Sequence, residues 1–196
     1  MRPDTPSSPA VPLPSPALAV RLRGLAWWVR SLALLGALVL VALPPWILLA
    51  TAGPDDPVSS LYGGGLLELL QGEMTPAVRA RLAGVTVLPV AVALAALWQL
   101  WALFGAYRRG DVFGPRPLGH MRRFGWAMAA LALVEPLSRS LASVAVSLDN
   151  PPGQRQLVVT LGSHDYALLM CALVFVAVAR VMAEAGRLAA ENEGFV

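Results

Sequence analysis

Four long apolar stretches alternate with short polar segments along this chain. We expect membrane-spanning helices over about residues 28–50, 85–107, 124–148 and 165–182. The first contains the run 31–50, which has no charged side chain, and a helix of that length spans roughly 30 Å, the thickness of a bilayer's hydrocarbon core. The pattern predicts an all-α fold, a four-helix transmembrane bundle with short extracytoplasmic loops.

The first apolar stretch permits a second interpretation. Arginines precede it and Ala50-Thr51-Ala52 follows it, an order that also occurs in secretory signal peptides. The run is longer than the apolar region of a typical signal peptide and contains Pro44 and Pro45, so we favour a retained helix. The two prolines should kink its last third.

The polar segments carry signals for turns and helix ends. Prolines crowd the N-terminal segment, and we expect residues 1–26 to form a disordered cytoplasmic tail. Thr75 followed by Pro76 is typical of a helix start, which predicts a short helix leading into the second span. We expect a loop over 111–123, and a cytoplasmic helical extension of the last span over 183–196.

The connection between the third and fourth spans should begin with a turn, because residues 149–153 read Asp-Asn-Pro-Pro-Gly. Apolar residues then alternate over 156–161, which suggests a short extended segment. Ser163 is placed to cap the helix of the fourth span.

Composition supports a membrane environment. Hydrophobic residues make up 57% of the 196 positions and charged residues 14%, and the mean hydropathy is +0.63. A soluble domain of this size needs a larger charged surface, so the apolar excess must face lipid. All fifteen basic residues are arginine, as expected of a GC-rich bacterial genome. The net charge of +3 is too small to indicate direct nucleic-acid binding.

Arginine placement predicts the orientation of the chain. Eleven arginines lie in the N-terminal segment, the loop between the second and third spans, and the C-terminal segment. Three, Arg79, Arg81 and Arg155, lie in the other two loops. Because short arginine-rich loops stay in the cytoplasm, we expect both termini there, in a multi-pass protein of the cell's inner or plasma membrane.

Two charged residues lie inside the third span. Glu135 and Arg139 are four residues apart on one helix face, which predicts an ion pair in the bundle interior. Pairing lowers the cost of placing either charge in hydrocarbon. The pair can be structural, or part of a polar site for a proton, an ion or a small ligand. We expect Glu135→Ala to impair folding or insertion.

The remaining reactive side chains form no catalytic or metal-binding group in the sequence. His120 and His164 fall in opposite compartments and cannot share a metal, although His164 beside Asp165 could make a weak pH-sensing or metal contact. Ser163 is too near His164 in the chain for the geometry of a catalytic triad. Cys171 is the single cysteine, a small side chain in an apolar run. We expect neither an enzyme nor a cofactor.

Two charged segments on the predicted cytoplasmic side, the connection between the second and third spans and residues 183–196, could contact anionic lipid or a cytoplasmic partner. Residues 183–196 also space acidic and basic side chains as helical ion pairs. The candidate contact residues are Arg108, Arg109, Phe113, Arg122, Arg123, Glu184, Arg187 and Glu191. A purely topological role would also explain the arginines, so both interpretations stay open.

The same segments carry a family resemblance. Residues 107–113 (Tyr-Arg-Arg-Gly-Asp-Val-Phe), 122–126 (Arg-Arg-Phe-Gly-Trp) and 183–196, with its Glu-Asn-Glu patch, resemble in that order a bacterial membrane family called domain of unknown function 2975. The resemblance covers roughly residues 30–196 and implies four spans and a C-terminal helix. Members are often considered alongside small helix-turn-helix regulators, which implies a sensing or regulator-sequestering role. The family has no established catalytic residues.

Two functions follow as hypotheses. The first is a noncatalytic membrane protein that acts as a sensor or anchor for a small cytoplasmic transcriptional regulator. The second is a small transporter or channel subunit that works as an oligomer. The polar residues available to line its path are Gln99, Glu135, Ser138, Arg139, Ser140 and Ser143.

Overall fold

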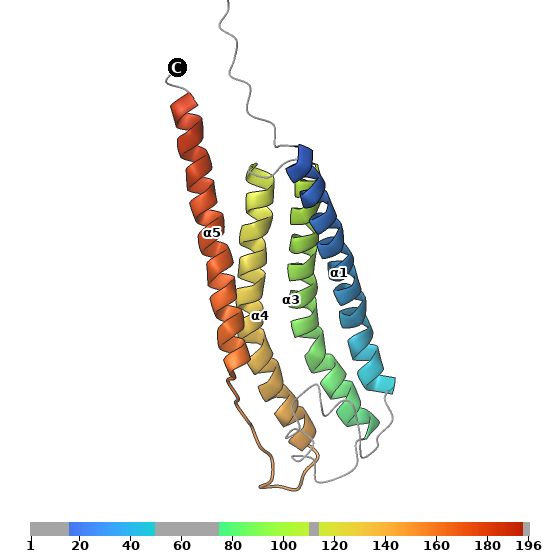
Figure 1. The fold of residues 1–196 in the computed structure, drawn as a ribbon. Coiled ribbons are helices and arrows are strands. Elements are labelled where there is room, and N and C mark those ends of the chain that lie inside the picture. Colours follow the sequence, from blue (N-terminus) through green and yellow to red (C-terminus); the bar gives the residue numbers. More distant parts are fainter. Residues whose placement is uncertain (1–15, 50–74, 110–113, 194–196) are drawn as a thin grey trace, which may run out of the picture.

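Four long helices dominate the structure, a computed structural model that describes residues 16–49, 75–109 and 114–193. They are α1 (Pro16–Leu49), α3 (Pro76–Arg108), α4 (Pro115–Ser147) and α5 (Ser163–Glu193). Successive helices run in opposite directions, so the start of α1 and the end of α5 lie at the same end of the molecule (Figure 1). Within the described ranges there is no strand, and the all-α prediction is confirmed.

Each helix is long and apolar enough to cross a membrane. The candidate spans are Gly24–Leu49, Pro76–Arg108, Pro115–Ser147 and Ser163–Leu188. The shortest of them has 26 residues and is therefore roughly 39 Å long, more than the hydrocarbon core requires. The chain is accordingly a multi-pass membrane protein with four spanning helices, as the hydrophobic pattern predicts.

Two helices begin earlier than the sequence suggests. α1 starts at Pro16, so the expectation of a disordered tail up to residue 26 is wrong for 16–26, while residues 1–15 lie outside the described residues. α4 starts at Pro115, which corrects the loop expected up to residue 123. Both errors have one cause. Prolines suggest a loop, yet the first turn of a helix accepts proline because its N–H groups have no partner within the helix.

Other predicted boundaries are confirmed. Thr75 caps α3, since its hydroxyl accepts a hydrogen bond from the Val78 N–H at 3.3 Å, and Pro76 takes the first helical position. The expected short helix is the beginning of α3 itself. α5 runs unbroken to Glu193, which confirms the helical extension for the described residues. α1 continues through its paired prolines, and the kink expected there stays a prediction.

The connection from α4 to α5 folds back along α4 (Figure 1). It begins with the expected turn, in which the Gln154 N–H donates to the Pro151 carbonyl at 3.1 Å and Gly153 adopts a φ of +92°. The irregular segment that follows is held by two serines of α4. Its amides at Gln156 and Val158 donate to the hydroxyls of Ser147 and Ser143 at 3.2 and 3.0 Å.

Because of this return, α5 begins beside the interior of α4, about two turns before that helix ends. Gly162, rather than the expected Ser163, caps α5: its carbonyl accepts from the Tyr166 N–H at 3.4 Å. The carboxylate of Asp165, the third residue of the helix, in turn accepts from the Gly162 N–H at 2.8 Å, as the acidic side chain of a capping box does. The fold-back thus sets the level at which Asp165 meets α4.

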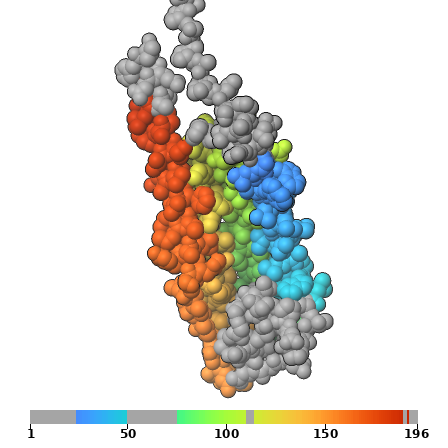
Figure 2. Space-filling model, in the orientation of Figure 1, coloured from blue at the N-terminus to red at the C-terminus, as the bar shows by residue number. Residues whose placement is uncertain are grey.

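The helices pack in chain order. α1 packs against α3, α3 against α4, and α4 against α5, and no comparable contact joins α1 to α5 in the described residues. Figure 2 shows α3 and α4 between α5 on one side and α1 on the other. The outer helices are therefore packed mainly along one side each.

The packed faces use small side chains and leave large apolar ones outside. Ten of the eighteen buried hydrophobic residues in the described ranges are alanine, whereas Trp28 and Leu32 of α1 are each 70% exposed. Small residues let helix backbones approach closely in a bilayer, and lipid covers the exposed apolar side chains. Among the described glycines, Gly125 of α4 leaves the least room: an added Cβ would lie 2.7 Å from Val176 Cγ2 and 3.1 Å from the Ala172 carbonyl oxygen.

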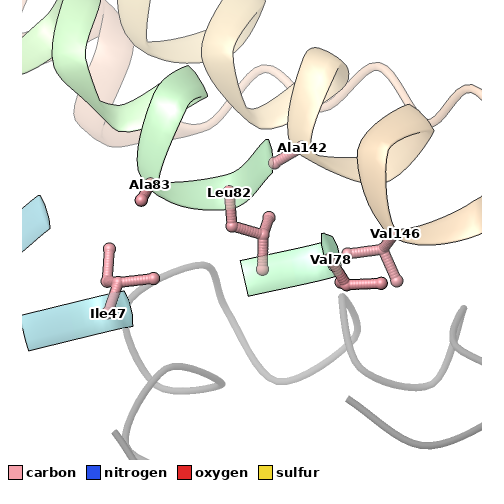
Figure 3. Packing of buried hydrophobic residues seen from close by; sticks show 6 residues of the cluster. All are labelled: Ile47, Val78, Leu82, Ala83, Ala142 and Val146. Carbon is pink, nitrogen blue, oxygen red and sulfur yellow. The ribbon is translucent and has the colours of Figure 1, made fainter. Parts of the chain in front are cut away.

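The larger buried side chains gather toward the end where α3 begins and α4 ends. Ile47 of α1 meets α3 and α4 residues there (Figure 3). The cluster comprises Ile47, Val78, Leu82, Ala83, Ala142 and Val146, and Leu43 packs against it. Arg81 closes the same end with a two-pronged ion pair to Asp149, both N–O distances being 3.0 Å. Ile47 and Leu43 also line the first candidate site.

Candidate functional site

A pocket of about 360 Å³ lies next to that apolar cluster, and we call it the polar pocket. One wall is apolar and comes from α1 and α3, through Leu40, Leu43, Ile47, Pro89, Val90 and Ala93. The other wall is polar and comes from α4 and the start of α5, through Glu135, Ser138, Arg139 and His164. Both residues of the predicted intramembrane pair therefore line one pocket.

The partner of Arg139 differs from the prediction. Its Nη2 atom donates to both carboxylate oxygens of Asp165, at 2.5 Å each, and no ion pair joins it to Glu135 in the described structure. The expected i,i+4 pair is therefore wrong in its partner. The reason is tertiary: the fold-back after α4 brings a second carboxylate beside the guanidinium, and Asp165 is only 6% exposed. Pairing offsets the cost of burying both charges.

Glu135 lies opposite His164, the residue that was predicted, beside Asp165, to make a weak pH-sensing or metal contact. Its Oε2 lies 3.6 Å from His164 Nε2, within reach of an ion pair but beyond a normal hydrogen bond. Most of the His164 side chain is exposed, while the Glu135 side chain is 31% exposed. The carboxylate of Glu135 is thus the weakly bonded charge of the pocket.

Two buried polar atoms of the pocket-lining residues have no hydrogen-bond partner in the described structure: the Ser138 hydroxyl oxygen and Arg139 Nε. Ser138 itself is 5% exposed. A serine hydroxyl within a helix can donate to a carbonyl of the preceding turn, as Ser140 does to the Pro136 carbonyl at 2.9 Å. Ser138 instead presents a free donor and acceptor at the wall of the pocket.

Asp165 is the site residue whose role the sequence did not reveal. A usable signal was present, because an acidic residue in the first turn of an apolar helix is costly in a membrane without a cation nearby. Arg139 is the arginine inside the third predicted span, so it was available in the sequence as that cation. Within the described residues no group of three or more His, Cys, Asp or Glu side chains could hold a metal.

His120 lies inside α4 rather than in the expected loop. Its Nδ1 is 2.7 Å from the Oε1 of Gln99 in α3, so the two polar groups satisfy each other between helices. Gln99 therefore joins His120 and does not line the polar pocket.

A second hollow lies at the opposite end, between the start of α4 and the end of α5. This basic groove encloses about 390 Å³ and is lined by Pro115, Leu118, Gly119, Arg122, Ala179, Arg180, Ala183, Gly186 and Arg187. It brings together Arg122 and Arg187, which come from the two segments predicted to contact a partner. Arg180 joins them, although the sequence marked it only as a topological arginine. It lies seven residues before Arg187, a spacing that keeps both on one helix face.

Arg187 is already neutralised within α5. It pairs with Glu184 at 2.5 Å and with Glu191 at 2.8 Å, which confirms the predicted helical ion pairs. Arg122 and Arg180 have no ion pair or hydrogen bond through their side chains in the described structure. Arg108, Arg109 and Arg123 are exposed and do not line the groove, and Phe113 lies outside the described residues.

The fold and these two sites define the class of the chain: a polytopic helical membrane protein with a polar pocket among its helices. The profile of a family described as "Protein of unknown function (DUF2975)" matches residues 71–195, more than half of the chain. The chain belongs to this family, which confirms the resemblance carried by the sequence motifs. The match starts after α1, later than the expected residue 30. No curated protein and no solved structure matches the chain.

Proposed function

We propose that this chain is a noncatalytic protein of the plasma membrane that anchors a small cytoplasmic regulator through the basic groove. The observation that carries the proposal is the convergence of Arg122 and Arg180, which are far apart in sequence, on one groove. Neither guanidinium has a protein partner in the described residues, so both remain available to a ligand.

The distribution of arginines supports a cytoplasmic position for this groove. α3 ends, α4 begins and α5 ends at the same end of the molecule (Figure 1). That end carries most of the arginines, including Arg108, Arg109, Arg116, Arg122 and Arg123 around one short connection. Arginine-rich short connections are retained in the cytoplasm during insertion. In this orientation both termini are cytoplasmic as well.

The chemistry of the groove favours an acidic segment of a partner protein. Guanidinium groups bind carboxylates through paired hydrogen bonds, and two unpartnered arginines offer two such positions. The lining of the groove includes Gly119, Ala179, Ala183 and Gly186, whose small size permits a close approach of a partner backbone. A small helix-turn-helix regulator, the partner that the family resemblance implies, is one source of such a segment.

A crosslinking experiment on the full chain in its native membranes tests the proposal. A photoreactive benzoyl-phenylalanine replaces Ala183 in the groove, and the same residue replaces exposed Thr160 at the opposite end as a positional control. We expect one small soluble protein to crosslink reproducibly at position 183 and not at 160. The purified partner should then bind the reconstituted chain directly.

Charge reversal provides the matched control. Arg122→Glu combined with Arg180→Glu should abolish the crosslink, because it replaces both free cations of the groove. Arg108→Glu combined with Arg123→Glu reverses the same number of charges at exposed positions outside the groove lining and should leave the crosslink unchanged. Equal losses in both variants, or identical crosslinks at positions 183 and 160, would remove the proposal.

The transporter hypothesis gains less support. Of its six candidate path residues, Glu135, Ser138 and Arg139 line the polar pocket. The others are hydrogen-bonded elsewhere: Gln99 to His120, and the hydroxyls of Ser140 and Ser143 to carbonyls of α4. The described residues therefore offer a local pocket for this function and no continuous polar path.

A further inference from the structure

The polar pocket has two chemically different walls. Along α1 and α3 it offers aliphatic side chains such as Leu40, Leu43 and Val90, which suit a hydrocarbon chain. Across from them, α4 and α5 offer a carboxylate, a hydroxyl and an imidazole from Glu135, Ser138 and His164. A volume of about 360 Å³ is within the range of small-molecule sites. The pocket therefore suits an amphipathic molecule with one compact polar head.

The charges at the polar wall decide which head group fits. Arg139 and Asp165 neutralise each other through the hydrogen bonds at 2.5 Å, and the buried Arg139 Nε, which has no hydrogen-bond partner in the described structure, adds a donor to the wall but no net charge to the pair. Glu135 is left with the mostly exposed imidazole of His164 at 3.6 Å, a contact too long for a normal hydrogen bond, so its carboxylate has no close cationic partner in the described structure. An anionic head would be repelled by Glu135, whereas a cation would neutralise it in a medium of low dielectric.

Ser138 supplies the second observation. Its hydroxyl is buried, lines the pocket and has no hydrogen-bond partner in the described structure. It lies three residues after Glu135, one helical turn along the same wall. A head with several N–H donors can bond both the carboxylate and this hydroxyl oxygen, which a head with one donor cannot do at the same time.

We propose that the polar pocket binds an amphipathic primary amine in its ammonium form. The ammonium group donates to the Glu135 carboxylate and the Ser138 hydroxyl, and the hydrocarbon chain lies along the wall of α1 and α3. The site is separate from the basic groove, so it goes beyond the anchoring role and does not depend on it. The ammonium can belong to a free alkylamine or to the headgroup of an aminophospholipid.

Photoaffinity labelling of the full chain in phosphatidylcholine nanodiscs tests this site. The probe is decylamine with a diazirine in its chain, and the competitors are decylamine, decanol and decanoate, which share one chain length. We expect saturable labelling of α1 and α3 residues at the pocket, with decylamine competing at concentrations at least about tenfold lower than the other two. Equal competition by all three, or labelling spread over the outer helix surfaces, would refute the proposal.

Variants separate the head contact from the chain contact. Glu135→Gln keeps the shape of the side chain and should weaken decylamine binding about tenfold, a loss typical of a charge-assisted hydrogen bond. Glu184→Gln removes the same charge at the far end of α5 and should have no effect. Ala93→Phe fills the pocket from the apolar wall and should abolish labelling with Glu135 intact.

A lipid arm identifies the source of the ammonium. If phosphatidylethanolamine added to the nanodiscs competes with the probe, the site binds a lipid headgroup; if it does not, the site binds a free amine. Full labelling of both Glu135→Gln and Ala93→Phe overturns the assignment. Variants that abolish labelling of the polar pocket should leave the crosslink at position 183 in the basic groove unchanged. The two proposals can therefore be refuted independently of each other.

Discussion

Arg139 of α4 and Asp165 of α5 form an ion pair across 26 positions of sequence, although Glu135 stands one helical turn from Arg139. The Arg139 side chain is 32% exposed and the Asp165 side chain 6%; Arg139 lines the polar pocket, and the pair joins two helices. It fixes the start of α5 against α4 and leaves Glu135 without a strong protein partner. Both consequences can be measured.

Asp165→Asn should destabilise the fold more than Glu135→Gln. The asparagine oxygen can still accept from Gly162, but Arg139 loses its counter-charge, and breaking a buried pair costs about 3 kcal/mol. For Glu135→Gln we expect less than about 1 kcal/mol, because its contact to a mostly exposed histidine is long. Free energies of unfolding in mixed micelles, from denaturant titrations, provide the comparison. If Glu135→Gln instead lowered the free energy of unfolding more than Asp165→Asn, Arg139 would be paired with Glu135 in its own helix and not with Asp165.

Gly125→Ala should loosen α5 from α4. The new Cβ would meet Val176 Cγ2 at 2.7 Å and backbone atoms of α5 at 3.1 Å, so the helices must separate, at a cost of about 1–3 kcal/mol. Gly119→Ala in the same helix meets nothing within 4 Å and should be neutral or slightly stabilising. Thermal unfolding of the two variants checks this. Adding Val176→Ala should restore part of the loss, since it relieves only the side-chain clash.

Ser143→Ala and Ser147→Ala should free the segment that returns along α4. Each removes the acceptor of one backbone amide, at Val158 or Gln156, worth about 1 kcal/mol. Hydrogen exchange should accelerate by about fivefold at the corresponding amide, which is what that free energy predicts. Ser140→Ala is the control, because its hydroxyl bonds only its own helix. Unchanged exchange in the first two variants would mean that the serines do not hold this segment.

Topology reporters should place the two ends of the bundle on opposite sides of the membrane. A fluorescent protein fused after Val196 should fluoresce, because it folds in the cytoplasm. Alkaline phosphatase inserted at Thr160 should be active, because it requires the oxidising extracytoplasmic side. The reverse pattern would place the basic groove outside the cytoplasm and contradict the anchoring role.

Much of the architecture follows from the sequence because its causes are local. Helix length and hydropathy predict the four spans, and Thr75 with Pro76 predicts the start of α3. The ion pairs of Arg187 with Glu184 and Glu191 follow from helical periodicity on an exposed face, where no other element competes. The early starts of α1 and α4 escape prediction because proline favours both loops and first helical turns.

The sites depend on contacts that no local pattern contains. Helical periodicity predicts that Arg139 pairs with Glu135. The observed partner is Asp165, which comes close to Arg139 only because the segment after α4 folds back and is held by Ser143 and Ser147. Likewise, packing of α4 against α5 is what joins Arg122 and Arg180 in one groove. Sequence determines which segments enter the lipid, because hydrophobicity acts on each segment alone. Tertiary structure decides the partner of each charge, because electrostatic pairing depends on distances between helices.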